Sequence, residues 1–269
     1  DNDDSRYLVA DLRTPWDVRP ALALGAALTG QAVEAPAGQC VSAALFAAPE
    51  PGPIADPKPV PFCFPETGLA GVRTTDLYLA MDAGPVGLGG QGGHGHNDLT
   101  AFVFRAEGQD LIVDRGCSSY VRDQNLRNAM RAGSAHAVLL PEDQDLGGLD
   151  AGPFRIIDPA APIPPQVESK GTRYSVTCGH DGFAGIAYQR ALVLDSTAAV
   201  GAWRLQCTDR LVSASGKAIP FSVRRYFPLA PGLKVTPASD GQSARITCAR
   251  SGALWQMTWT PASQTRVIE

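Results

Sequence analysis

The sequence contains little lysine, no close pair of cysteines and no long hydrophobic run, and each shortage argues against one class of protein. No run approaches the ~18 consecutive apolar residues of a membrane-spanning helix, so we expect no transmembrane helix. The 6 cysteines form no CxxC pair, which argues against a zinc ribbon or a thioredoxin-type site. Lys and Arg number 23 against 27 Asp and Glu, and a net charge of −4 does not suit a nucleic-acid binder.

What is present indicates a folded, strand-rich protein. Hydrophobic residues make up 44% and charged residues 19% of the 269, while 28 Gly and 22 Pro indicate many turns. Arginine outnumbers lysine by 19 to 4, a bias that suits carboxylate, sulfate or phosphate groups but that GC-rich coding would also produce. The chain begins at Asp1 without Met or a signal peptide, so we expect it to be part of a longer protein.

Three stretches of different character follow one another along the chain. Residues 1–48 predict a short helical segment, in which Asp17 is a suitable N-cap for an apolar helical face. Residues 49–72 contain seven prolines, which predict an extended linker. From residue 73 onward the apolar residues alternate with a period of two, so residues 73–269 predict an antiparallel β-sandwich or barrel.

Short alternating runs bounded by Gly, Pro or Asp mark the expected strands. One or two helical turns are expected near residues 124–130, and little else in this half has a helical period. The expected strands are residues 75–81, 99–105, 110–113, 137–140, 174–178, 186–194, 201–207, 221–226, 233–236, 243–248 and 254–260.

The chain has 4 histidines, and two of them follow a glycine-rich run that opens at residue 84. This run is not a phosphate-binding loop, because it lacks GK[ST] and precedes a strand. On an extended segment His94, His96 and Asp98 would point to one face, an arrangement that suits a divalent metal. The alternative is a polar turn at the start of a strand.

Asp114 follows an apolar run and is expected near the core, where a metal or an arginine could be its partner. Alternatively, Asp114 caps the following turn. His136 considered alone is more typical of a hydrogen-bonded core histidine. A hairpin turning near Gly108 would place Asp114 opposite residues 100–102 rather than opposite His96, so spacing does not by itself complete a site.

Four segments in their order resemble the C-terminal half of the heparinase II/III-like polysaccharide lyases. They are GGHGHNDLTAFVFRAEGQDLIVDRGCSSY (92–120), RNAMRAGSAHAVLL (127–140), GHDGF (179–183) and the opening DNDDSRYL. The resemblance implies that residues 1–48 end an N-terminal helical α/α-toroid and that the remainder is its β-sandwich. Most of the toroid would lie outside this chain, as a further domain of the full-length protein.

The same resemblance assigns roles to individual residues. It implies that His94 faces the substrate as a catalytic group and that His96, Asp114 and His136 bind a metal, usually zinc. The family's Ser-Thr before this last histidine is Ala132-Gly133 here, which leaves the metal positions intact but changes the surroundings.

Three further residues are candidates for binding an acidic sugar: Tyr120, Arg127 and Arg131. The two arginines suit such a substrate as planar forks, or they form salt bridges at the interface with the toroid. His180 either borders the site or has a structural role in a turn.

The function implied is that of a polysaccharide lyase that cleaves a uronic-acid polysaccharide by β-elimination, with the isolated chain expected to be inactive. One alternative is a non-catalytic carbohydrate-binding module. Another is a cupin-like metal enzyme, although the Glu that a cupin has shortly after its second histidine is absent here. Family analogy implies a periplasmic or secreted location, with the cytoplasm as the alternative.

Overall fold

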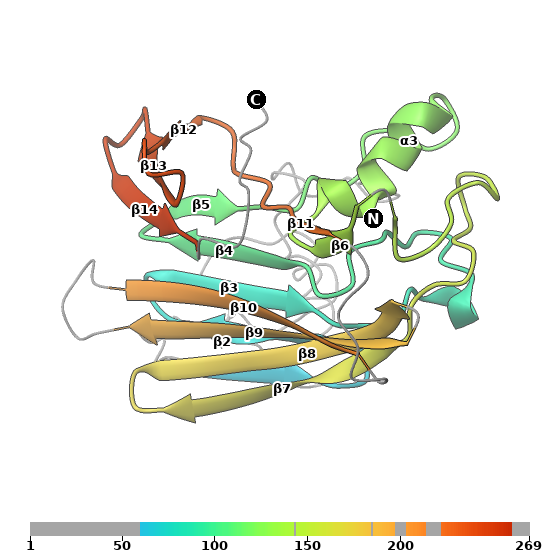
Figure 1. The fold of residues 1–269 in the computed structure, drawn as a ribbon, viewed down its shortest axis with the longest axis horizontal. Helices are drawn as coiled ribbons and strands as arrows, with labels where there is room; N and C mark the ends of the chain where they lie inside the picture. Colours follow the sequence, from blue (N-terminus) through green and yellow to red (C-terminus); the bar gives the residue numbers. More distant parts are fainter. Residues whose placement is uncertain (1–59, 143, 184, 197–202, 214–221, 260–269) are drawn as a thin grey trace, which may run out of the picture. The chain divides into compact units, whose positions relative to one another are not determined.

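The computed structural model describes residues 60–142, 144–183, 185–196, 203–213 and 222–259 (Figure 1). The chain divides into two compact units, Asp1–Val60 and Pro61–Glu269. The predicted helical segment, residues 1–48, lies outside the described residues, so the fold below is that of the second unit. No helix in the described ranges is both long enough and apolar enough to cross a membrane.

The first sheet has five strands in the order β1-β2-β3-β4-β5, and β2 to β5 pair antiparallel. In β4 every second side chain, Phe102, Phe104 and Ala106, is buried, as the period of two predicts. The strands are β1 (Val60–Phe64), β2 (Leu69–Arg73), β3 (Leu77–Asp82), β4 (Phe102–Ala106) and β5 (Gln109–Ile112).

The second sheet has four long strands in the order β10-β9-β8-β7, all antiparallel. The alternation in β9 buries Tyr188, Leu192 and Leu194 on one face. The strands are β7 (Pro162–Lys170), β8 (Arg173–Phe183), β9 (Ile186–Ser196) and β10 (Trp203–Ser213).

The core lies between the two sheets. A continuous cluster of buried side chains includes Leu79 and Phe104 from the first sheet and Val176 and Leu192 from the second. At one contact between the layers, the Cys178 thiol lies 3.4 Å from the sulfur of Met81. The predicted antiparallel β-sandwich is therefore confirmed, and Figure 1 shows β7 to β10 lying across β2 and β3.

Smaller elements surround the sandwich. The helix expected near residues 124–130 is confirmed as α3, and the described part of residues 137–260 contains no α-helix. These elements are η1 (Leu88–Gly90), α3 (Gln124–Arg131), η2 (Gly133–Ala135), β6 (Leu139–Pro141), β11 (Val223–Arg225), β12 (Leu233–Pro237), β13 (Ser243–Cys248) and β14 (Leu254–Thr258). β6 pairs with β11, and β12 to β14 form a three-stranded sheet.

Three proline-containing or short strands were not expected from the sequence. β1 and all but the last residue of β2 lie inside residues 49–72, which the proline content predicted to be a linker, and β7 contains three prolines. β1 and β7 are edge strands, where a missing amide donor leaves the ladder intact on the paired side. The sandwich therefore begins by Val60, whereas the domain boundaries at residues 48 and 72 stay predictions.

A capping contact at the start of α3 gives a test of local stability. The side chain of Asp123 accepts a hydrogen bond of 2.9 Å from the amide of Leu126. We expect Asp123→Ala to lower the free energy of unfolding by ~1 kcal/mol, because an N-terminal amide loses its partner. Urea denaturation of the full chain measures this. Asp123→Asn keeps an acceptor and should stay near wild type; an equal loss in both variants would contradict the capping role.

Candidate functional site

The loop from β3 to β4 carries His94, His96 and Asp98 and is shaped by close backbone contacts. A Cβ at Gly95 would lie 2.6 Å from both the Cγ2 atom and the carbonyl oxygen of Val86, so only glycine fits there. The chain bends at His94 and again at Asn97 instead of forming an extended segment. The three polar side chains therefore do not share one face, in contrast to the expectation from their spacing.

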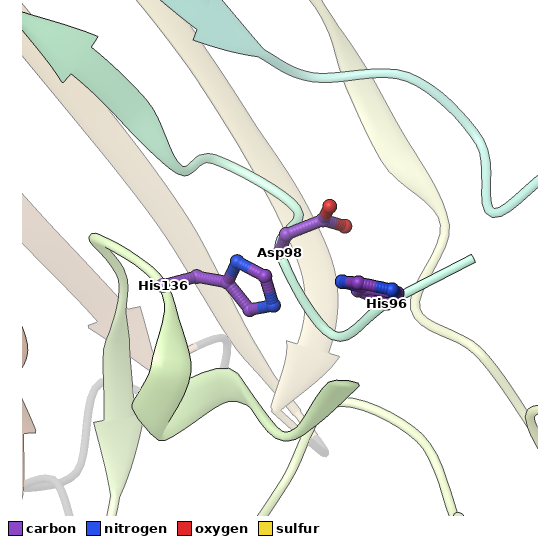
Figure 2. Close-up of side chains that lie close together, drawn as sticks. All are labelled: His96, Asp98 and His136. Atoms are coloured by element: carbon purple, nitrogen blue, oxygen red, sulfur yellow. The ribbon is translucent and has the colours of Figure 1, made fainter. Parts of the chain in front are cut away.

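His96 and Asp98 meet His136, which lies just after η2. One ligand atom from each of these three residues lies within 4.8 Å of the other two. Both imidazoles are buried, and their ring centroids are 5.1 Å apart. Figure 2 shows the Asp98 side chain beside both imidazole rings. Two imidazoles and a carboxylate at this separation are a donor set that suits zinc or a similar divalent ion.

Asp114 lies on the other nitrogen of His136. Its Oδ2 atom is 2.6 Å from His136 Nδ1, and its Oδ1 atom accepts a hydrogen bond from the amide of Gly116. Burial alone would raise the pKa of Asp114 and lower that of His136, but their hydrogen bond and mutual attraction shift both pKa values the other way. His136 Nε2 is buried and has no hydrogen-bond partner among the described residues, so it remains available to a metal.

The predicted β4–β5 hairpin is present, and Asp114 follows its second strand. The strands turn at Glu107 and Gly108, and Phe104 pairs with Ile112. If this register continued past β5, Asp114 would lie opposite Phe102, within the range expected from the sequence. His96 reaches His136 from the loop between β3 and β4.

The half-buried carboxylates of Asp82 and Asp98 repel each other. Burial and the neighbouring charge of Asp98 raise the pKa of Asp82 to about 7, and burial raises the pKa of Asp98. Burial and the charge of His136 lower the pKa of His96 to about 3, which keeps this imidazole neutral at pH 7. A neutral imidazole beside carboxylates is the form that binds metals, and a cation would offset the repulsion. Asp82, at the end of β3, was not among the predicted site residues.

His94 lies in an aromatic cluster and outside the described group of close ligand atoms. Its ring centroid is 5.7 Å from that of Tyr120 and 6.1 Å from that of Phe154. Tyr120 and Phe154 are stacked at 5.9 Å, and Arg127 lies 4.7 Å above the Tyr120 ring. Phe154, which is 46% exposed, was not predicted from the sequence. Its only sequence signal was an aromatic residue in a Gly- and Pro-rich loop.

The two arginines of α3 are fully buried and bind backbone carbonyls. Arg131 donates hydrogen bonds to the carbonyl oxygens of Gly95, Gly152 and Arg155, and so ties the histidine loop to residues 152–155. Arg127 donates to the carbonyl of Pro153 and to the Cys117 sulfur. These are structural contacts. The predicted role of both arginines as forks for an acidic sugar stays a prediction.

His180 belongs to the core next to the site. It is fully buried, and its Nδ1 atom accepts a hydrogen bond from the amide of Gly182. The centroid of its ring lies 4.7 Å from that of Phe183 and 4.6 Å from that of Tyr188. Burial lowers its pKa to about 4. Of the two roles considered for His180, these contacts favour the structural one.

Comparisons with known proteins agree with the β-sandwich fold. The family described as Heparinase II/III-like, C-terminal, matches residues 56–267. The fold resembles heparan sulfate lyase HepC from Pedobacter heparinus, with 14% identity, a TM-score of 0.54, and coverage of 77% of this chain and 29% of that chain. It also resembles the heparinase III BT4657 gene product, with 16% identity, a TM-score of 0.55, and coverage of 76% and 28%.

This chain spans less than a third of the length of those two structures. No curated protein matches the sequence at a significant level. The family match gives no support to the cupin-like alternative. Because the match extends over most of the sequence and the β-sandwich agrees with it, the chain belongs to the heparinase II/III-like family, whose C-terminal domain it contains.

Proposed function

We propose that this chain is the C-terminal part of a polysaccharide lyase that cleaves a uronic-acid-containing polysaccharide by β-elimination. The family supports a polysaccharide lyase in general terms. The observation that carries the proposal is the close group formed by the buried His96 and His136 and the half-buried Asp98. His96 is two residues along the chain from His94. An N-terminal helical domain of the full-length protein would complete the active site.

The metal group consists of two histidines and one carboxylate. His96 and His136 are the nitrogen donors. The imidazole of His96 is neutral at pH 7, and the Nε2 atom of His136 is buried without a hydrogen-bond partner among the described residues. The carboxylate is Asp98, which has an oxygen within 4.8 Å of a ring nitrogen of each histidine. Asp114, the ligand that the resemblance implies, contacts the Nδ1 atom of His136 instead. When bound, a divalent ion such as zinc would neutralise the carboxylates and cross-link the two segments that carry the histidines.

His94 acts on the substrate. In β-elimination a base removes the proton at C5, the adjacent carboxylate is neutralised, and an acid protonates the 4-oxygen as the C4–O bond breaks and a C4–C5 double bond forms. His94 serves either as the base or as the neutralising group, held against Tyr120 and Phe154. The remaining groups come from the helical domain.

The test is a substrate panel with the full-length protein. Incubation with heparan-type, alginate and other uronic-acid polymers should produce an unsaturated sugar, recorded as an increase in ultraviolet absorbance for at least one polymer. Neutral polysaccharides are the control. Binding to a uronic-acid polymer without any such product would instead favour a non-catalytic carbohydrate-binding module.

A further inference from the structure

A buried arginine of the second sheet lies behind the candidate site. Arg190 is in the middle of β9, and the alternation that buries Tyr188 and Leu192 turns its side chain inward, where it is fully buried. Directly opposite on β10 is Asp209, whose side chain is 1% exposed. A buried ion pair is costly unless every remaining donor and acceptor has a partner, so these partners matter.

Asp209 holds the guanidinium of Arg190 in one orientation. It accepts hydrogen bonds of 2.7 Å from Arg190 Nε, 2.6 Å from the Tyr188 hydroxyl and 2.5 Å from Arg225 Nε. Burial alone would raise the pKa of Asp209, but the charge of Arg190 and these hydrogen bonds outweigh it and hold the pKa below its usual value. The carboxylate therefore stays charged and keeps the fork of Arg190 in place.

The Nη1 end of the Arg190 guanidinium binds the two chain segments that carry Asp98 and His136. Arg190 Nη1 donates to the carbonyl oxygen of Thr100, at 2.9 Å, and to that of Ala137. Thr100 is two residues beyond Asp98, and Ala137 directly follows His136. Thr100 lies in a turn and Ala137 in a bend, so neither residue belongs to a strand.

Thr100, whose carbonyl oxygen accepts this hydrogen bond, has an unfavourable backbone conformation. It has a φ of 73°, although it is a β-branched residue, and it is fully buried. Such a conformation persists only where the surroundings determine it, and it occurs most often at functional sites. Besides Arg190, Asp82 holds this turn, since its carbonyl accepts a hydrogen bond of 2.8 Å from the Thr100 amide.

We propose that Arg190 is a positioning residue that holds the Asp98 turn and the His136 segment at the separation the metal group needs. The proposal rests on the proposed function for its metal. This positioning role requires the planar shape of the guanidinium and not only its charge. The guanidinium of Arg190 must bind the Asp209 carboxylate and the carbonyl oxygens of Thr100 and Ala137 at the same time. A lysine ammonium keeps the charge but lacks this planar fork.

The experiment compares Arg190→Lys with Arg225→Lys in the full chain. Arg225 contacts the same carboxylate of Asp209 but forms no described hydrogen bond to Thr100 or Ala137, so it is a matched control. Zinc affinity is measured by competition with a chelator. We expect Arg190→Lys to weaken zinc binding by ~10–100-fold, the usual effect of removing a group that orients ligands. Arg225→Lys should stay within about threefold of wild type, since its contact ends at Asp209.

A second readout, hydrogen exchange of the metal-free protein, does not depend on the metal. Arg190→Lys should accelerate amide exchange about tenfold or more in residues 96–101 and 133–138 but not in the β12–β14 sheet, because local opening then requires less free energy. If wild type binds no zinc and this local acceleration still appears, the metal assignment fails while the positioning role stands.

Equal zinc affinity in Arg190→Lys and wild type, together with unchanged exchange, would overturn the proposal. The same loss in both lysine variants would also overturn it, because the charge network alone would then explain the effect. If Arg190→Lys does not fold, the double variant Arg190→Met, Asp209→Asn avoids a buried unpaired carboxylate, and the same two measurements apply to it.

Discussion

Replacing His94 by alanine in the full-length protein should lower the rate of polysaccharide elimination by ~10²–10⁴-fold, the usual range for a general acid–base group. Metal content and fold should be unchanged, because His94 lies outside the described group of close ligand atoms and packs against Tyr120 and Phe154. The paired measurement is metal content by elemental analysis and rate by ultraviolet absorbance. It requires a polymer that the wild-type protein cleaves.

The control for this prediction is Gln91→Ala in the same glycine-rich loop, where the side chain is exposed. It should keep both the rate and the metal. Loss of the metal in His94→Ala would make His94 a fourth ligand. An unchanged rate with unchanged metal would remove His94 from the active site.

The second large effect concerns the metal itself. We expect His96→Ala and His136→Ala each to reduce the bound zinc of protein purified without chelator from about one ion per chain to almost none. The reason is that each variant removes one of two buried nitrogen donors whose rings are 5.1 Å apart. Elemental analysis measures the content. Wild-type metal content in His96→Ala would contradict the assignment.

Two carboxylate variants then identify the third ligand. If Asp98 binds the ion, Asp98→Asn should lose as much zinc affinity as His96→Ala. In that case Asp114→Asn, which alters the partner of His136 Nδ1 and of the Gly116 amide, should lose ~10–100-fold. If Asp114 binds the ion, as the family resemblance implies, Asp114→Asn should show the larger loss. Equal wild-type affinity in both variants would leave the ion without a carboxylate ligand and contradict the proposed donor set.

Much of the fold could be predicted because its strands are amphipathic. Alternation located β4 and β9, and Gly108 was correctly expected at the turn between β4 and β5. β1 and β7 could not be recognised in this way, because their prolines resemble those of a linker until the strands are seen to lie at sheet edges. The helix at residues 124–131 could be predicted, but the burial of Arg127 and Arg131 could not.

The sequence identified most residues of the candidate site but not which of them are in contact. His96 and His136 were identified from the ordered segments, and the structure brings them together. The bend at His94 was not visible in the residue spacing, so His94 was expected on the same face as His96, whereas it lies among aromatic side chains. Phe154 and Asp82 had no local pattern that would distinguish them from loop and strand-end residues.

By itself, the sequence determined the class of fold and the residues that carry the chemistry, because alternation, turn residues and ordered short segments are local properties. Only the tertiary structure decided which of these residues meet. Asp114 and His136 are 22 residues apart, while Arg190 is 53 residues from Ala137 and 90 from Thr100. Such contacts depend on how two sheets pack and where a loop bends, and no local pattern contains that information.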